Sequence, residues 1–395
     1  MAKEGKTKTD RYDAAIVGGG AAGMVAAVSY LRRASHGRLI VIEANDVCGK
    51  KLLATGNGRC NISNLSADNY SETKDFFRSV GVLFRVEEGG RAYPMSGQAA
   101  SVRSALVFAL ERERAEIRCG ARVSRVENSD EGFMLFFEEG APVLSKRLLV
   151  ATGGKAGPQY GCFGDGYSIA RSLGHSVESI RPALVPLLYT EKEKGRLGGL
   201  AGVRIRTKAE LLIDGKCAAA SSGELQMTKY GLSGVMIFDL STMMPKSIIE
   251  GRPRTEILLD FVPGEEAAAL EGLILENKGL WLEGIVGKKL SDLLVRESGV
   301  YESGVESGVD ESGGASRIAA LAKNFRVSVC GTKGWKEAQS TLGGIRTAEV
   351  NEKTGESLIC KGLFFAGELL DPVFICGGFN LNHAWATGLR AGENL

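Results

Sequence analysis

Histidine and proline are scarce in this sequence, whose 395 residues include only three histidines and nine prolines. The eight cysteines form no Cys-x-x-Cys pair and show no metal-ligand spacing, so we expect neither a metal site nor a disulfide framework. No run of about 18 apolar residues is present, so we expect no membrane-spanning segment. The polar start MAKEGKTKTDR lacks the apolar core of a secretory signal. The cytoplasm is therefore the expected location.

A large net charge is also absent, because 49 basic and 47 acidic residues leave a formal charge of +2. Proteins dedicated to binding nucleic acid or a membrane surface normally carry a basic face. We therefore predict no nucleic-acid partner and no membrane partner, and we expect a small-molecule substrate. The composition does not indicate an oligomeric state.

The strongest local signal is a strand, a turn, a helix and a second strand near the N-terminus. Ala14–Val17 is a short apolar run, Ala21–Arg33 has helical character, and Leu39–Ile42 is a second apolar run. An acidic residue, Glu43, closes the second run. This order is typical of a nucleotide-binding βαβ unit.

The turn of this unit contains the dinucleotide fingerprint Gly-x-Gly-x-x-Gly. Gly18 makes the tight turn, Gly20 lets the main chain approach a pyrophosphate, and Gly23 lets the helix pack close to the strand. The helix N-terminus presents free N–H groups and the positive end of its dipole to the phosphates. Glu43 can accept hydrogen bonds from both hydroxyls of an adenosine ribose. The pattern therefore predicts a bound dinucleotide.

The rest of the chain predicts a two-domain α/β protein. We expect a flexible tail over residues 1–11, a cofactor domain over 12–185 and 341–395, and an inserted β-rich and helical substrate domain over 186–340. Within the insert, the Glu-Ser-Gly repeats of residues 297–315 predict a mobile loop, because their composition buries little apolar surface.

Individual elements follow from periodicity and turn residues. We expect helices at 72–85, 99–114, 166–173, 265–277 and 288–296, and strands at 117–127, 133–138, 143–150, 203–207, 209–213, 224–228 and 257–261. Asp165 is placed to cap the helix that follows it, and Asp214-Gly215 is a hairpin signal.

Two further strands end in small residues, at Ala151-Thr152-Gly153-Gly154 and at Ala366-Gly367-Glu368. Together with the fingerprint, this order resembles single-chain FAD flavoproteins of the glutathione-reductase-like fold. More closely, it resembles a family of bacterial NAD(P)/FAD-dependent oxidoreductases that includes aminoacetone-oxidase-like and bile-acid-pathway flavoproteins. The motifs that carry the resemblance are Gly49–Leu53, Thr55–Asn61, Tyr93–Ser96, Gly164–Tyr167, Leu173–His175, Gly231–Gly234 and residues 367–380.

The resemblance implies an FAD-binding Rossmann domain with an inserted β-barrel-like and helical domain. It also implies bound FAD, with NAD(P)H as a transient electron donor that has no Rossmann domain of its own. The cofactor-binding residues that we expect are Gly18, Gly20, Ala22, Gly23, Glu43, Ala44, Lys50, Lys51, Thr55, Gly56, Asn57, Gly58, Arg59, Cys60, Asn61, Val123, Thr152, Gly153, Gly154, Gly367, Glu368, Asp371, Gly378, Phe379, Asn380 and Leu381. The helix that opens at Gly377-Gly378 would direct its positive end at the flavin.

Several of these residues have a plain alternative. Lys50 and Lys51 are either close to the cofactor or solvated loop charges. Cys60 is either structural or a redox thiol, and a pair with Cys48 stays open. His383, inside the last helix, is either a proton donor or a packed helix residue.

No catalytic residue follows from the sequence, and the candidates for a proton donor are Tyr93, Lys229, Tyr230 and His383. The family usually has a histidine in the run before Gly231–Gly234, where this chain has Lys229. A role of that histidine therefore does not transfer to this chain, which leaves the substrate open.

Three functions are compatible with these observations. The first is an oxidoreductase that takes hydride from NAD(P)H and reduces an organic acceptor with an activated carbon–carbon double bond. The second is an oxidase that acts on an amine or amino-ketone with oxygen as acceptor. The third is a flavin-binding redox sensor without turnover.

Overall fold

The computed structural model describes residues 9–34, 37–248, 251–277, 282–300, 313–371 and 373–395. The chain forms two compact units, one of residues 1–182 and 339–395 and the other of residues 183–338. We call the first the cofactor unit and the second the barrel unit. The expected loop over residues 297–315 lies mostly outside the described residues, which omit 301–312.

The cofactor unit contains both ends of the chain. Its strands are β1 (Asp10–Val17), β2 (Leu39–Ile42), β3 (Ser63–Asn64), β4 (Phe84–Val86), β5 (Arg91–Pro94), β6 (Glu116–Arg118), β7 (Val123–Ser129), β8 (Gly132–Phe137), β9 (Val143–Val150), β17 (Ser340–Leu342) and β18 (Leu363–Phe365). Its helices are α1 (Ala21–Arg33), α2 (Tyr70–Ser79), α3 (Ala99–Arg112), α4 (Asp165–Ser172) and α11 (Phe379–Asn394), with 3-10 turns η1 (Leu52–Gly58), η2 (Glu88–Gly90), η3 (Pro158–Tyr160), η5 (Thr347–Glu349) and η6 (Gly367–Leu369). A short strand, β10 (Arg181–Ala183), lies at the boundary and pairs with β17.

The barrel unit contains the remaining elements. Its strands are β11 (Leu187–Tyr189), β12 (Arg204–Ile213), β13 (Lys216–Met227), β14 (Gly231–Ser233), β15 (Thr255–Asp260) and β16 (Phe325–Thr332). Its helices are α5 (Glu191–Leu197), α6 (Val235–Ser241), α7 (Ala267–Glu276), α8 (Glu283–Val286), α9 (Lys288–Glu297) and α10 (Gly314–Lys323), with the 3-10 turn η4 (Gly198–Leu200).

A seven-stranded sheet organises the cofactor unit, with the order β6-β2-β1-β9-β8-β7 and β18 paired to β9. The strands β6, β2, β1, β9 and β18 run parallel, and the hairpin of β7 and β8 is antiparallel. Val17 is the register partner of both Ile42 and Val150, and Val150 is also the partner of Phe365. The carboxyl ends of four parallel strands therefore meet at one edge of the sheet, where open α/β sheets bind ligands.

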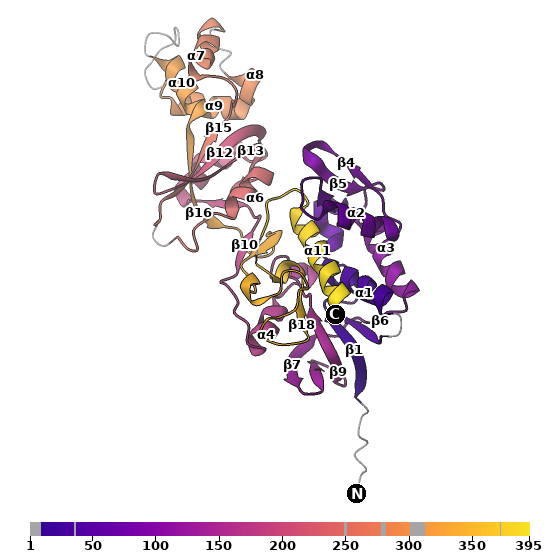
Figure 1. Ribbon diagram of the computed structural model, residues 1–395. Helices are drawn as coiled ribbons and strands as arrows, with labels where there is room; N and C mark the ends of the chain where they lie inside the picture. The colour runs from indigo at the N-terminus through magenta and orange to yellow at the C-terminus, as the bar shows by residue number, and fades with distance from the viewer. Residues whose placement is uncertain (1–8, 35–36, 249–250, 278–281, 301–312, 372) are drawn as a thin grey trace. The chain divides into compact units, whose positions relative to one another are not determined.

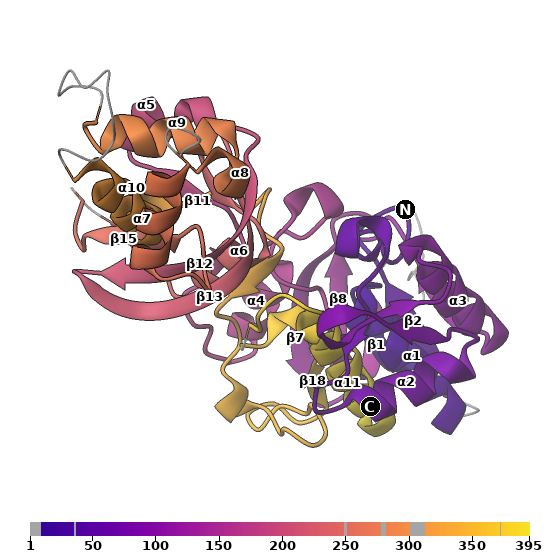
Figure 2. The same cartoon turned by 90° about the horizontal axis from the view of Figure 1, so that it is seen from above.

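Alternate residues of β1 face two different cores, as the pleat of a strand requires. Ala14 and Ile16 pack with α1, α3 and α11 on one face of the sheet. Ala15 and Val17 pack with α4, β7 and β18 on the other face. Figure 1 and Figure 2 both show α11, the C-terminal helix in yellow, beside α1 of the N-terminal βαβ unit.

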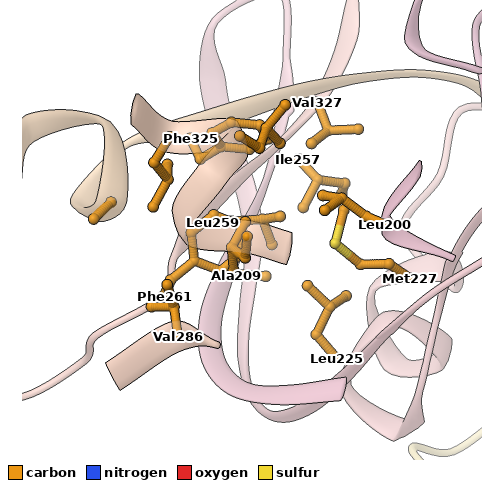
Figure 3. Packing of buried hydrophobic residues seen from close by; sticks show 14 of the residues in the cluster. Leu200, Ala209, Leu225, Met227, Ile257, Leu259, Phe261, Val286, Phe325 and Val327 are labelled. Carbon is orange, nitrogen blue, oxygen red and sulfur yellow. The ribbon is translucent and has the colours of Figure 1, made fainter. Parts of the chain in front are cut away.

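Six antiparallel strands close into a barrel in the order β11-β14-β13-β12-β15-β16. Inward-facing side chains such as Leu225, Met227, Ile257 and Leu259 fill its interior, as Figure 3 shows. The predicted hairpin turn is present, because Asp214 and Gly215, which join β12 to β13, both have positive φ. Together, the two units confirm the predicted fold class, an α/β Rossmann-type domain with an inserted barrel and helices.

Several predicted element boundaries are wrong. The helix expected over residues 72–85 ends at Ser79, because the chain turns at Gly81 with φ +85° and continues into β4. The strand expected over 117–127 is two strands, β6 and β7, that occupy opposite edges of the sheet. Residues 10 and 11, expected in the tail, belong to β1.

The barrel strands are longer than predicted. Residues 203–207 and 209–213 form the single strand β12, and the strand expected at 224–228 belongs to β13, which starts at Lys216. Asp165 does not cap its helix, because its carboxylate accepts two hydrogen bonds from Arg122 at 2.7 and 2.9 Å. Gly164 occupies the N-cap position instead.

Helices α1 and α11 approach closely because glycine and alanine line their contact. A methyl group at Gly388 would lie 2.5 Å from Ala22 O, and one at Gly392 would lie 2.2 Å from Ala26 O. These distances are far below van der Waals contact, so the contact requires glycine at both positions. Since α1 begins at the fingerprint turn, this contact fixes α11 relative to that turn.

The substitution Gly392→Ala tests this contact. We expect it to lower the free energy of unfolding by about 2 kcal/mol, because the added methyl group overpacks the contact with α1. The control is Gly272→Ala in α7, where a methyl group meets no atom within 4 Å. The control should be stabilised by about 0.5–1 kcal/mol, since alanine is the better helix former. Urea denaturation measures both, and stabilisation of both variants would contradict the packing argument.

Candidate functional site

The fingerprint turn has the geometry that a dinucleotide requires. Gly18 has φ +110°, and a methyl group there would lie 2.4 Å from Ala151 O. A methyl group at Gly23 would lie 1.9 Å from Gly18 O, so Gly23 allows the helix to start close to the strand. Gly20, the N-cap of α1, has no atom within 4 Å of its missing methyl position, which leaves the helix N-terminus open to a ligand.

Glu43 is buried behind this turn and is already hydrogen-bonded. Its Oε2 accepts the Gly19 N–H at 2.8 Å, and its Oε1 accepts the Asn45 N–H at 2.8 Å and Asn45 Nδ2 at 2.7 Å. Oε2, which accepts one hydrogen bond, retains acceptor capacity for a ribose hydroxyl. Ala44 lies between Glu43 and Asn45 in the chain.

A second group of predicted residues follows β9 and β18 at the same sheet edge. A methyl group at Gly154 would lie 2.3 Å from Thr341 Oγ1 and 2.7 Å from Glu368 Oε1. By contrast, nothing lies within 4 Å of the same position at Gly153, so the main chain is open there. Thr152 and Gly153 therefore border accessible space, and Gly154 is enclosed by polar side chains.

Glu368 joins the loop after β2 to the end of β18. Its Oε2 accepts a hydrogen bond from Lys51 Nζ at 2.6 Å, and its Oε1 accepts the Thr341 N–H at 3.0 Å. Burial lowers the pKa of Lys51, but the Glu368 carboxylate outweighs that effect, so the Lys51 pKa lies above its ordinary value. Lys51 thus lies at the predicted site as an ion-paired cation, whereas Lys50 is half-exposed and 3.6 Å from Asp46.

The loop Thr55–Asn61 folds tightly around left-handed residues. Gly56, Asn57, Gly58 and Cys60 all have positive φ. Arg59 places its guanidinium 4.0 Å from the centre of the Tyr93 ring and donates to Glu87 at 2.5 Å. This arrangement orients Tyr93, one of the candidate proton donors.

The N-terminus of α11 approaches the same loop. A methyl group at Gly378 would lie 2.3 Å from Ser63 O and 2.8 Å from Asn61 Oδ1. Asn61 Oδ1 is a buried acceptor that has no hydrogen-bond partner among the described residues. Asn380 holds the segment before α11, because its side chain bonds Phe374 N at 3.0 Å and Phe374 O at 2.8 Å. Phe379 and Leu381, also predicted at the site, are half-buried in the first turn of this helix.

His383 lies one turn into α11 with its ring 5.2 Å from that of Phe374. Its Nε2 is buried and has no hydrogen-bond partner in the described part of the chain. Burial lowers the pKa of His383 to about 4, so the imidazole is neutral at pH 7. A neutral imidazole is a poor general acid, which disfavours His383 as the proton donor.

The cysteines near the site are reduced in the described structure, in which all eight are free. Cys60 is fully buried, and burial raises its pKa to about 12. The pKa of Cys48 is likewise raised to about 12 by burial. Such thiols are poor nucleophiles, so the structural interpretation of Cys60 is favoured over a redox role.

The remaining predicted residues come from several elements of the two units. Val123 is buried at the start of β7. Lys229 is exposed and Tyr230 half-buried in the barrel unit, where Lys333 Nζ lies 3.9 Å from the Tyr230 ring centre. Gly367, Glu368 and Asp371 follow β18 as expected.

Sequence reasoning missed Thr341 at this site. Its Oγ1 accepts the N–H groups of Lys155 at 2.8 Å and Ala156 at 3.1 Å, which are more than 180 residues away in the chain. Its main-chain N–H donates a hydrogen bond to Glu368 Oε1. The only sequence signal is its position shortly before Gly343-Gly344.

These groups fit a dinucleotide flavin. The open N-terminus of α1 suits a pyrophosphate, the carboxylates Glu43 and Glu368 suit hydroxyl groups, and Asn61 offers an unpartnered acceptor near the second helix N-terminus. Among the described residues, no group of three or more His, Cys, Asp or Glu side chains is arranged to hold a metal ion. Within those residues, no helix combines the length and apolar character needed to cross a membrane.

Comparison with known proteins agrees with this geometry. Residues 66–394 match the family model described as HI0933-like protein Rossmann domain. The chain is 36% identical to the 3-dehydro-bile acid delta(4,6)-reductase of Clostridium scindens, over 96% of this chain and 97% of that protein. It is 27% identical to the ribosomal RNA dihydrouridine synthase of Escherichia coli, over 98% of each chain.

Among solved structures, the chain is similar to the 3-ketosteroid delta1-dehydrogenase of Sterolibacterium denitrificans, with a TM-score of 0.54. The identity is 13%, and the similarity covers 97% of this chain and 99% of that one. At this identity the likeness shows a shared fold.

The lowered pKa of His383 predicts a pH-dependent stability. Since the folded pKa of about 4 lies below the ordinary 6.5, the unfolded chain binds the proton more readily, and stability falls as pH decreases from 6.5 toward 4. The part of this loss of stability that His383 causes amounts to at most about 3 kcal/mol, and it should be absent from His383→Gln. Urea denaturation of the flavin-free protein from pH 8 to 4 measures it. Equal losses in both proteins below pH 6.5 would contradict the assignment.

Proposed function

The chain belongs to the HI0933-like family of Rossmann-domain flavoproteins, and we propose that it takes hydride from NAD(P)H through bound FAD and reduces an activated carbon–carbon double bond. The observation that carries the proposal is the near full-length similarity to the delta(4,6)-reductase. The family and the Rossmann fold support a flavin-dependent oxidoreductase. The nicotinamide donor and the acceptor are the proposed parts.

The names of the relatives point to one chemical class of acceptor. A delta(4,6)-reductase of a 3-dehydro steroid saturates a double bond conjugated with a ketone. A dihydrouridine synthase saturates the double bond of uracil, which is conjugated with a carbonyl. In both cases a hydride adds to the carbon remote from the carbonyl and a proton adds to the carbon next to it.

Each end of the chain has a separate role in this proposal. The fingerprint turn and Glu43 would hold the adenosine and pyrophosphate half of FAD, and Thr152–Gly154 with Glu368 would hold the middle of the cofactor. The positive end of the α11 dipole at Gly378 would favour negative charge on the flavin. When bound, FAD supplies the hydride transfer, and the protein supplies orientation and the proton.

Tyr93 is the proton donor that the geometry supports best. It is buried beneath the Arg59 guanidinium, in the strand beside the loop that meets α11. Two of the competing candidates have specific weaknesses, because His383 is neutral and Lys229 is exposed. Because Cys60 is buried and its thiol is inert, we do not include a thiol relay in the reaction.

A small-molecule enone is the leading acceptor, because the more similar relative carries that activity. Uracil within RNA is the second candidate, since two relatives of 27% and 26% identity are named ribosomal RNA dihydrouridine synthase. The prediction from net charge that no nucleic acid is bound therefore stays a prediction.

Anaerobic spectroscopy tests the proposed function. The purified protein, reconstituted with FAD, should lose its flavin absorbance on addition of NADH or NADPH and regain it on addition of an acceptor. A 3-keto-4,6-diene steroid and an unmodified ribosomal RNA, analysed by mass spectrometry for a gain of two hydrogens, distinguish the two acceptor classes. Reduction by amines in place of nicotinamides would support the oxidase instead.

Tyr93→Phe tests the proton donor. We expect the rate of acceptor reduction to fall by about 10²–10⁴, because general acid catalysis contributes a factor of this size. The rate of flavin reduction by NAD(P)H should stay within about twofold of the original, since it does not use this proton. Tyr230→Phe tests the other tyrosine among the candidates, and we expect both of its rates to be unchanged if Tyr93 is the donor. Equal slowing of both half-reactions in Tyr93→Phe would instead indicate a general structural defect.

A further inference from the structure

Tyr167 in α4 has a buried hydroxyl that the protein leaves unsatisfied. Its side chain is only 2% exposed, and although the Thr341 hydroxyl lies near its Oη, no group within the described residues accepts the Tyr167 proton. Burial raises the pKa of this phenol, so it stays protonated and keeps a proton to donate. A buried hydroxyl without a partner is costly to the fold, which makes this position informative.

The hydroxyl lies among the polar groups at the ends of β9 and β18. The electrostatic neighbours of Tyr167 are Glu368, Thr341, Asp371 and Cys162. Tyr167 follows Gly166 directly, and a methyl group at Gly166 would lie 2.3 Å from Thr152 Oγ1, so α4 packs against the end of β9. Tyr167 therefore belongs to the same sheet edge as the predicted middle of the cofactor site.

The neighbouring protein groups are already committed. Thr341 Oγ1 accepts two main-chain N–H groups, which use its lone pairs. Each oxygen of Glu368 accepts one hydrogen bond, from Lys51 or from Thr341 N. Thr341 Oγ1 therefore has no lone pair left for the Tyr167 proton, and the Glu368 oxygens, which each keep one, do not accept it within the described residues.

The charges around Tyr167 indicate which kind of ligand could supply an acceptor for its proton. The charges of two carboxylates, Glu368 and Asp371, act on Tyr167, and Glu368 is already paired with Lys51, so a phosphate is disfavoured here. A neutral chain of hydroxyl groups fits, because each hydroxyl both accepts from a phenol and donates to a carboxylate. In FAD that part is the ribityl chain.

We propose that Tyr167 donates a hydrogen bond from Oη to a hydroxyl of the ribityl chain of bound FAD, as a cofactor-binding residue beside Glu368. This inference rests on the proposed function only in that FAD is the cofactor. It does not depend on the acceptor or on the electron donor. Without FAD, the Tyr167 hydroxyl destabilises the folded protein. With FAD bound, the hydroxyl contributes to FAD affinity.

FAD titration of the flavin-free full-length protein, followed by quenching of flavin fluorescence, tests this proposal. Tyr167→Phe should raise the Kd for FAD about tenfold, the size expected for one buried hydrogen bond. The matched control is Tyr189→Phe in the barrel unit, where Tyr189 is also fully buried with an unpartnered Oη. Its Kd for FAD should be unchanged.

Two further measurements separate a ribityl contact from a general packing defect. Binding of ADP, which lacks the ribityl chain, should be equal in the original protein and Tyr167→Phe by calorimetry. Without FAD, Tyr167→Phe should melt at the same temperature as the original protein or above it, because an unpaired buried hydroxyl has been removed. With saturating FAD, Tyr167→Phe should melt at a lower temperature than the original protein.

The outcomes distinguish this proposal from the proposed function. If the original protein binds FAD and Tyr167→Phe binds it equally well, the role of Tyr167 is wrong and the flavin function stands. An equal loss of ADP and FAD affinity in Tyr167→Phe, or a lower melting temperature without FAD, would assign Tyr167 a structural role. If the original protein binds no FAD, both proposals fail.

Discussion

The close contact between α1 and α11 is the constraint on which the cofactor unit depends. It joins the first helix of the chain to the last, and glycine at positions 388 and 392 is what lets their backbones approach. Trp385 completes the attachment, because it is fully buried and its Nε1 donates to Ile62 O at 2.9 Å. Through this contact, the N-terminus of α11 is held relative to the fingerprint turn at the start of α1.

The polar groups of the site come from segments that are distant in the chain but share one sheet edge. Glu43 follows β2, Thr152 follows β9 and Glu368 follows β18, and these strands run parallel in register. Parallel strands bring their carboxyl ends to the same edge, where the main chain is open and helices begin. The part-buried pair of Lys51 and Glu368 then connects the loop after β2 to the end of β18, across more than 300 residues of sequence.

The proposed chemistry needs groups that hold FAD in place and one side chain that donates a proton. In the proposed function, glycine turns, carboxylates and helix N-termini orient FAD. The proton must come from a side chain that keeps it at neutral pH, and burial makes His383 unsuitable by lowering its pKa to about 4. Tyr93, whose ring lies 4.0 Å from the Arg59 guanidinium, is the donor that we propose. The carbonyl-conjugated double bond shared by the relatives' substrates is what makes separate hydride and proton addition possible.

The sequence alone determined the fingerprint, the strands that lead into the glycine turns, the fold class and the family. Local patterns encode these features, because glycine at a tight turn and apolar runs in strands act within a few residues. It did not determine the end of α2 at Ser79, the separation of β6 from β7, or the use of Asp165 as a partner of Arg122. Thr341 and Tyr167 were likewise identified only by the tertiary structure. Their roles depend on burial and on neighbours from distant segments, and neither is set by the residues beside them in the chain.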